Sequence, residues 1–174
     1  MNYRLLLIIA LSSLAGCAAI ESQPEGARDF QVISFLQGKM TERDGEWIIY
    51  EYGEDLSFEE NGECVFNRKA SPCMWHGYIL KYESHGKEVN LECRGFQNIP
   101  ANFGNPNELI EENSQEFEYV IPLKGKESTF INPQYVTGAF QENIIKSATI
   151  CFVGDKPVLR FKQITRFNHR AVKT

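Results

Sequence analysis

Residues 74–94 read MWHGYILKYESHGKEVNLECR, and this stretch predicts the fold. Apolar and polar side chains alternate on both sides of the turn-forming segment 84–86, which is the pattern of two β-strands that are each buried on one face. If the strands pair as a hairpin, a slip of one residue would destroy the match between their apolar faces, so the register is well defined. That register aligns three pairs on the apolar face: Tyr82 with Val89, Leu80 with Leu91, and Tyr78 with Cys93.

A second hairpin is predicted between residues 144–153 and 158–167, through the turn Gly154-Asp155-Lys156-Pro157. Pairing Gly154 with Pro157 aligns two apolar pairs on one face, Phe152 with Leu159 and Ile150 with Phe161. The opposite face then carries a basic stripe, together with Cys151; the stripe consists of Arg160, Lys162 and Arg166.

Further strands are expected at 46–52, 64–68, 116–123, 128–131 and 30–36, although the last could equally be a short helix. Asn105, Pro106 and Glu108 predict the start of one short helix over 105–113, because they form an N-cap, a first-turn proline and a capping box. No composition break or repeat divides the chain after residue 27. The sequence therefore predicts a single all-β domain over 28–174, an antiparallel sandwich or barrel of about seven to nine strands.

The N-terminus, MNYRLLLIIALSSLAGC, has the form of a secretory signal. Arg4 supplies a positive charge, an apolar run follows, and small residues precede Cys17. The apolar run is too short to span a bilayer core of about 30 Å as a helix.

Leu14-Ala15-Gly16-Cys17 resembles the lipobox of bacterial lipoproteins at each position. The resemblance implies that residues 1–16 are removed as a signal peptide and that fatty acyl chains such as palmitate are attached at Cys17. Several acyl chains give a stable membrane anchor. In bacterial lipoproteins, an aspartate directly after the acylated cysteine favours the inner membrane. Position 18 is an alanine, and this absence of aspartate resembles the outer-membrane sorting pattern. We therefore expect a lipid anchor in the outer membrane, a flexible tether over 17–27 and a domain that faces the periplasm, with exposure at the cell surface left open.

Four further cysteines remain, Cys64, Cys73, Cys93 and Cys151, and an even number in an oxidising compartment predicts two disulfides. Three pairings are possible. The first predicted hairpin places Cys73 too far from Cys93 for a bond, which favours Cys64–Cys73 and Cys93–Cys151. The second predicted hairpin turns Cys151 away from the apolar face, and this conflict stays open.

The charge distribution argues against a nucleic-acid partner, because the formal net charge is −5. Residues 42–63 contain nine acidic side chains against Arg43 alone, whereas residues 156–174 contain six basic side chains and no acidic one. This polarity could face a partner, or it could simply be solvated.

No catalytic, cofactor-binding or metal-binding motif is evident. There is no GxSxG nucleophile elbow, HExxH pair or phosphate-binding glycine loop. Cys73 and His76 form a CxxH pair, but a disulfide is the better use of that cysteine in an oxidising compartment. We therefore expect a protein that is not an enzyme and holds no metal or cofactor.

Three functions are compatible with these features. The first is a binding or accessory subunit of an envelope machine for secretion, pilus assembly or conjugation. The second is an immunity or inhibitor lipoprotein against a toxin or lysozyme, and the third is a small-ligand carrier or hydrolase, which requires a deep pocket. The aromatic residues suit either a sandwich core or a binding surface. The candidate partner-binding residues are Trp47, Trp75, Arg160, Lys162 and Arg166.

Overall fold

The computed structural model of the protein describes residues 30–66, 68–101, 111, 113–126, 128–138 and 143–167. These residues form ten β-strands, one more than the upper end of the predicted range. The strands are β1 (Gln31–Arg43), β2 (Glu46–Tyr52), β3 (Asp55–Ser57), β4 (Gly62–Phe66), β5 (Lys69–Glu83), β6 (Val89–Gln97), β7 (Glu116–Leu123), β8 (Thr129–Thr137), β9 (Ile144–Val153) and β10 (Lys156–Arg166). Over these ranges, no helix has the length and apolar character needed to cross a membrane.

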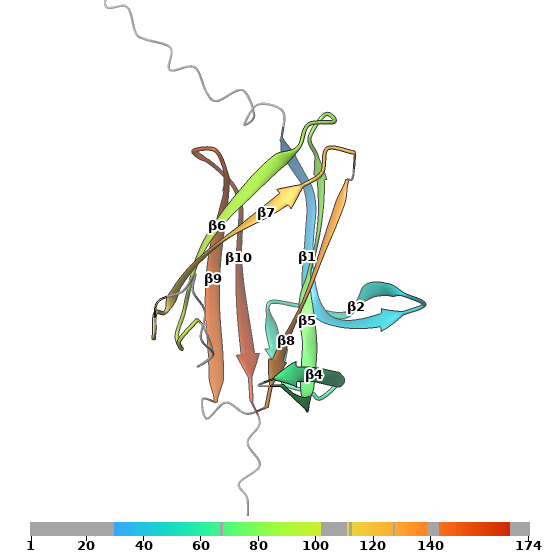
Figure 1. Cartoon of the computed structure of the whole chain (residues 1–174), viewed down its shortest axis with the longest axis vertical. Coiled ribbons are helices and arrows are strands. Elements are labelled where there is room, and N and C mark those ends of the chain that lie inside the picture. The colour runs from blue at the N-terminus through green and yellow to red at the C-terminus, as the bar shows by residue number, and fades with distance from the viewer. Residues whose placement is uncertain are drawn as a thin grey trace, which may run out of the picture.

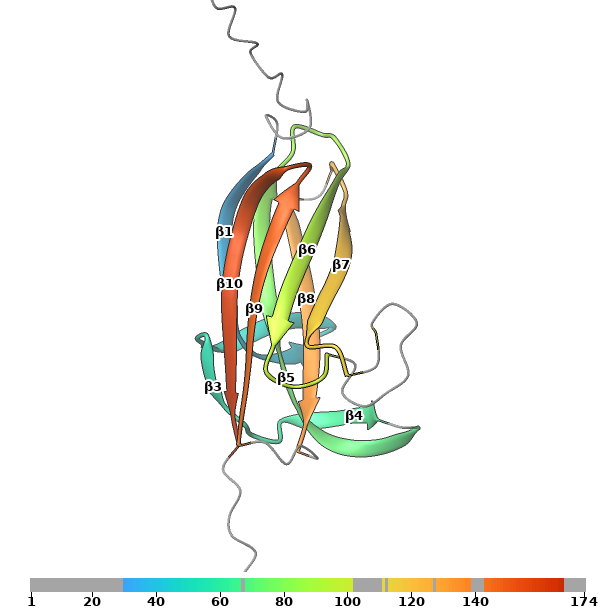
Figure 2. The same cartoon turned by 90° about the vertical axis from the view of Figure 1, so that its left-hand side faces the viewer.

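The strands form a two-layer sandwich (Figures 1 and 2). In the first sheet, β5 is central: β1 and β4 pair with successive parts of one edge, β8 pairs with the other edge, and β2 pairs with β1. In the second sheet the order is β3-β10-β9-β6-β7. All pairs are antiparallel except β3 with β10. The prediction of an all-β sandwich is therefore confirmed.

The core lies between the sheets and contains two apolar clusters. The larger one takes side chains from both inner faces, including Tyr78, Leu80 and Tyr82 of β5 and Leu91 and Cys93 of β6. The smaller one lies towards the other end of the strands, with members that include Leu56, Met74, Val136, Ile145 and Phe167. Alternate side chains along each strand are buried because successive residues point to opposite faces of a sheet.

The predicted hairpin between residues 74–82 and 87–94 is wrong, although the faces assigned to its residues are correct. Strand β5 pairs with β1, β4 and β8, whereas β6 pairs with β7 and β9 in the other sheet. All six residues assigned to the apolar face are buried in the larger core cluster. They meet across the sandwich, because facing sheets bury the same alternating pattern as neighbouring strands do.

The second hairpin is confirmed, but its register differs from the prediction by two residues next to the turn and by one residue beyond the bulge. The turn consists of Gly154 and Asp155 alone, and the pairing shifts between Pro157 and Leu159. Leu159 therefore lies opposite Cys151, and both are buried. A β-bulge of this kind adds one residue to one strand and changes the register beyond it.

Two disulfides are present, in the pairing that the sequence favoured: Cys64–Cys73 and Cys93–Cys151. Cys93 and Cys151 are directly opposite each other on neighbouring strands β6 and β9. The conflict over Cys151 disappears, because the shifted register turns its side chain into the core, where it is 0% exposed.

Several predictions fall outside the described residues. These are the signal peptide over 1–16, the acylated Cys17, the tether over 17–27 and almost all of the helix over 105–113. The prediction for 30–36 is settled, since these residues belong to the long strand β1 apart from Phe30, which lies next to it in the core.

Candidate functional site

Three aromatic side chains form an aromatic cluster, consisting of Trp47, Trp75 and Tyr135. Trp75 and Tyr135 lie opposite each other on β5 and β8, and their ring centroids are 5.3 Å apart. Trp47 comes from β2, which extends away from the sandwich (Figure 1), and its ring lies 4.7 Å from that of Trp75. Tyr135 is 40% exposed and both tryptophans are partly exposed, so the cluster forms part of the surface.

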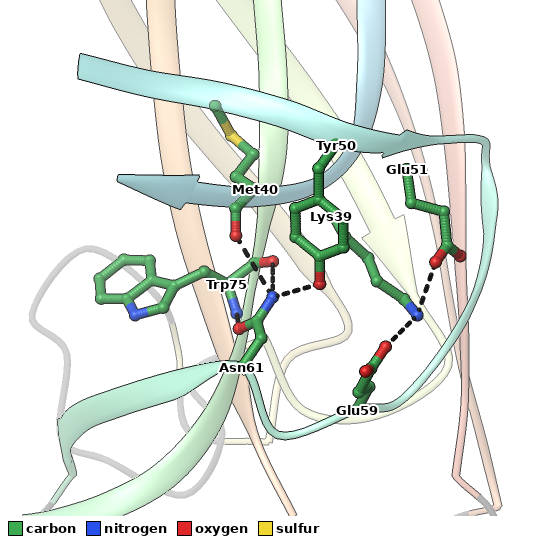
Figure 3. A network of polar contacts seen from close by, with 7 residues as sticks. All are labelled: Lys39, Met40, Tyr50, Glu51, Glu59, Asn61 and Trp75. Carbon is green, nitrogen blue, oxygen red and sulfur yellow. Dashed lines mark hydrogen bonds and ion pairs between the residues drawn. The ribbon is translucent and has the colours of Figure 1, made fainter. Parts of the chain in front are cut away.

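Asn61 fixes the backbone beneath this cluster (Figure 3). Its amide nitrogen donates to the carbonyl oxygens of Met40 and Trp75, both at 3.2 Å, and to the Tyr50 hydroxyl at 2.8 Å. Its amide oxygen accepts a hydrogen bond from the Trp75 backbone N–H at 2.7 Å. One side chain therefore joins β1, β2 and β5, the three strands that carry or adjoin the two tryptophans.

Gly62 allows Trp75 to pack closely on the backbone of β4. A Cβ atom at this position would lie 2.7 Å from the indole ring, closer than real contacts allow. Since only glycine leaves this space, the position of the Trp75 ring depends on Gly62.

Lys39 stabilises the same end of the domain through two ion pairs (Figure 3). Its ammonium group lies 3.0 Å from a carboxylate oxygen of Glu51 and 2.9 Å from one of Glu59, while its own side chain is 5% exposed. Burial acts to lower the pKa of Lys39, but the hydrogen bonds and charges of Glu59 and Glu51 outweigh it, so the pKa is raised. The interaction joins β1, β2 and the segment before β4.

The predicted basic stripe lies on the outer face of β10, in the other sheet. Arg160, Lys162 and Arg166 share this face and are exposed. Arg166 makes two hydrogen bonds to the Asp55 carboxylate, at 2.7 and 2.6 Å, which lower the pKa of Asp55. The five candidate partner-binding residues are thus divided between two surfaces, with the two tryptophans in ring contact on one and the three basic residues on the outer face of β10 on the other.

No protein-family profile matches the chain, and no curated protein matches it. The structure is similar to the crystal structure of an immunoglobulin-like protein from Pseudomonas aeruginosa, with a TM-score of 0.53 and 11% sequence identity. The alignment covers 80% of this chain and 98% of that one. The fold is immunoglobulin-like. An immunoglobulin-like sandwich supports many unrelated functions, so the function must be argued from the surface of this chain.

On this immunoglobulin-like sandwich, the Cys73–His76 pair does not form a metal site. Cys73 is bonded to Cys64, and so the CxxH pair cannot offer a thiolate. Among the residues that the structure describes, no group of three His, Cys, Asp or Glu side chains is close enough to hold a metal ion.

Sequence reasoning missed Lys39, Asn61 and Tyr135. Lys39 lies in a strand with apolar neighbours, which indicated a buried position. Its ion-pair partners Glu51 and Glu59 are 12 and 20 residues away in the sequence, so no local pattern links them to it. Asn61 precedes Gly62, and an Asn-Gly pair predicts a turn and not a side chain that joins three strands. Tyr135 lies beyond the predicted strand over 128–131, because the real strand β8 continues to Thr137.

Proposed function

We propose that the protein is a non-enzymatic bacterial lipoprotein, anchored in the outer membrane through Cys17, that binds a protein partner on the periplasmic side. The aromatic cluster of Trp47, Trp75 and Tyr135 is the observation that carries this proposal. The partner is a component of an envelope machine for secretion, pilus assembly or conjugation.

The cluster has the properties of a binding hot spot. Tryptophan and tyrosine dominate the energetics of protein interfaces, because they bury large areas and have few rotatable bonds. Here the rings contact one another, and Asn61 and Lys39 already fix the strands that carry or adjoin the two tryptophans. A preorganised surface loses less conformational entropy on binding than a flexible one.

The position of the cluster supports its role. Strand β1 begins at the end of the sandwich where the β5–β6 and β9–β10 turns lie, whereas β2 and β4 lie towards the opposite end (Figure 1). From Gln31 to Lys39, β1 covers about 25 Å at the usual rise of a strand. With an anchor that precedes β1, the aromatic cluster lies on the part of the domain far from the membrane, where a partner can reach it.

Site-specific photo-crosslinking in living cells tests the partner. A photoreactive phenylalanine analogue replaces Tyr135, and crosslinked proteins are identified by mass spectrometry. We expect one envelope protein to be captured from position 135 and not from Val120, which is 57% exposed on the other sheet. Adding Trp47→Ala should reduce this crosslink at least about tenfold, as expected for a hot-spot residue.

Tyr52→Ala is the matched control, because Tyr52 is an exposed aromatic residue on the same strand as Trp47 but is not part of the aromatic cluster. It should leave the crosslink unchanged. Equal capture of abundant proteins from positions 135 and 120 would refute the proposal, and capture of a toxin or a lysozyme would favour the inhibitor function instead.

The anchor is tested separately by mass spectrometry of the N-terminus after purification from membranes. We expect the chain to begin at an acylated Cys17, and Cys17→Ser should abolish labelling by radioactive palmitate. A chain that begins at Met1 with an unmodified thiol at position 17 would refute the lipoprotein assignment.

A further inference from the structure

A cleft of about 650 Å³ lies between the two sheets, beside the packed core. Its place follows from the inner-face residues along β9: Ile145 belongs to the smaller core cluster, Ser147 and Thr149 line the cleft, and Cys151 and Val153 belong to the larger cluster. The same order occurs along β5, where His76 lies between Met74 and Tyr78. The cleft therefore separates the two apolar clusters.

Polar side chains line this part of the interior, where the inner face of a sandwich is usually apolar. Those that are buried or half-buried are His76, Gln97, Ser147, Thr149, Gln163 and Thr165. Burying polar groups is unfavourable unless they form hydrogen bonds, so a polar band between two apolar clusters suits a space that can hold solvent or a ligand. Its volume falls in the range of small-molecule sites.

His76 lines the cleft, and its hydrogen bond to Gln163 defines the roles of its two ring nitrogens. The residue is 8% exposed, and its Nδ1 atom accepts a hydrogen bond from the Gln163 side-chain nitrogen at 2.6 Å. A neutral imidazole that accepts at Nδ1 carries its proton on Nε2. No residue within the described ranges forms a hydrogen bond with Nε2, so this N–H is a donor available to a bound molecule.

The cleft carries almost no charge. Burial lowers the pKa of His76 to about 4, so the ring is neutral at physiological pH. Of the described residues that line the cleft, Glu118 alone has a charged side chain, and it is 74% exposed and paired with Arg94 at 3.2 Å. The aromatic side chains Phe117, Tyr119 and Phe161 provide apolar walls. A charged ligand would lose its hydration here without gaining a partner of opposite charge.

We propose that this cleft binds an uncharged, largely apolar small molecule with a carbonyl or ether oxygen that accepts a hydrogen bond from Nε2 of His76. This inference goes beyond the proposed function and does not depend on it. The cleft adjoins the proposed contact surface, because Trp75 and Tyr135 of the aromatic cluster also line it.

Titration with Nile red tests the proposal, because this dye is uncharged and planar, carries a ring carbonyl and fluoresces in apolar surroundings. The full chain with Cys17→Ser is used throughout, since acyl chains would require detergent that itself dissolves the dye. We expect saturable binding of one dye per chain. His76→Phe should weaken it at least about tenfold, as expected for the loss of one hydrogen bond.

Two neighbouring residues give a matched pair of variants. Ser147 lines the cleft on the inner face of β9, whereas Ala148 is exposed on the outer face. Ser147→Phe should fill the cleft and abolish binding, and Ala148→Phe should leave binding unchanged. Absence of saturable binding, or equal binding by the two variants, would overturn the proposal.

A measurement on the chain with His76 and Ser147 unchanged makes the test independent of whether the variants fold. The imidazole signals of His76 in nitrogen–proton NMR spectra should shift in a saturable manner as dye is added, while those of His85, which is exposed in a turn, should not. Unchanged His76 signals at saturating dye would equally refute the proposed site.

Discussion

The two disulfides should stabilise the domain to different extents, because they close loops of very different length. The perturbation is replacement of both cysteines of one disulfide by alanine, either Cys64 with Cys73 or Cys93 with Cys151. The sequence separations are 9 and 58 residues. A disulfide stabilises the fold mainly by reducing the entropy of the unfolded chain, and this effect grows with the logarithm of loop length.

The loop-entropy relation gives a loss of about 2.6 kcal/mol for the short loop and about 4.2 kcal/mol for the long one. All four cysteines are buried, with exposures between 0% and 5%. The loss of sulfur packing therefore adds a similar cost to both variants and largely cancels in their comparison. The difference of about 1.6 kcal/mol reports on the loops themselves.

The assay is equilibrium unfolding in urea, followed by tryptophan fluorescence and by circular dichroism. Both tryptophans lie in the aromatic cluster, so fluorescence reports on that end of the domain, while circular dichroism reports on the sheets as a whole. The reasoning is refuted if the free energy of unfolding falls as much for Cys64→Ala/Cys73→Ala as for Cys93→Ala/Cys151→Ala.

Three further predictions concern single buried sites, and urea unfolding checks each. Lys39→Met should change the free energy of unfolding by less than about 1 kcal/mol, because water can solvate the exposed carboxylates of Glu51 and Glu59. The double variant Glu51→Gln/Glu59→Gln should instead lower it by about 3 kcal/mol, because the ammonium group of Lys39 is then buried without an ion pair. Since the pKa of Lys39 is raised, its contribution is complete at neutral pH and is lost as pH rises beyond 10.5, so a flat profile there would contradict the ion pairs. The pKa of His76 falls from 6.5 to about 4 on folding, so the unfolded chain binds this proton at a higher pH than the folded chain. The free energy of unfolding of the wild type should therefore fall by about 3 kcal/mol between pH 6.5 and 4, and His76→Leu should remove this loss. Gly77→Ala should cost at least about 2 kcal/mol, since its Cβ would lie 2.0 Å from the Asn132 carbonyl oxygen; an unchanged midpoint would show that β8 can move aside.

The pairing of strands shows how far local pattern can predict this fold. The hairpin of β9 and β10 was predictable because its strands are joined by a short turn and share one edge. Its register was not, because the bulge between Pro157 and Leu159 adds a residue that no alternation pattern reveals. The error mattered, since it reversed the face on which Cys151 was expected.

The candidate site was predictable only in part. The sequence singled out Trp47 and Trp75, because large aromatic side chains suit binding surfaces. Their contact depends on β2 folding back along β1, and Tyr135 joins them through the pairing of β5 with β8. Arg166 was expected to face a partner, but its guanidinium is bound to Asp55, 111 residues away in the sequence.

By itself, the amino-acid sequence determined which faces of β5 and β6 are buried, since successive side chains of a strand point to opposite faces and apolar residues are driven out of water. It did not determine the buried face of β9, which depends on the bulge in β10. It also determined that the domain is all-β. The sequence only favoured the cysteine pairing, which the strand arrangement decided. Only the tertiary structure decided that β5 and β6 face each other across the core. The alternation of apolar and polar side chains is a property of one strand, whereas the pairing of two strands depends on which strand edges are free. Both edges of β5 pair with other strands, namely β1, β4 and β8, so β6 cannot pair with it. The aromatic cluster and the cleft beside His76 follow from that arrangement, because their residues come from strands that are distant in the sequence.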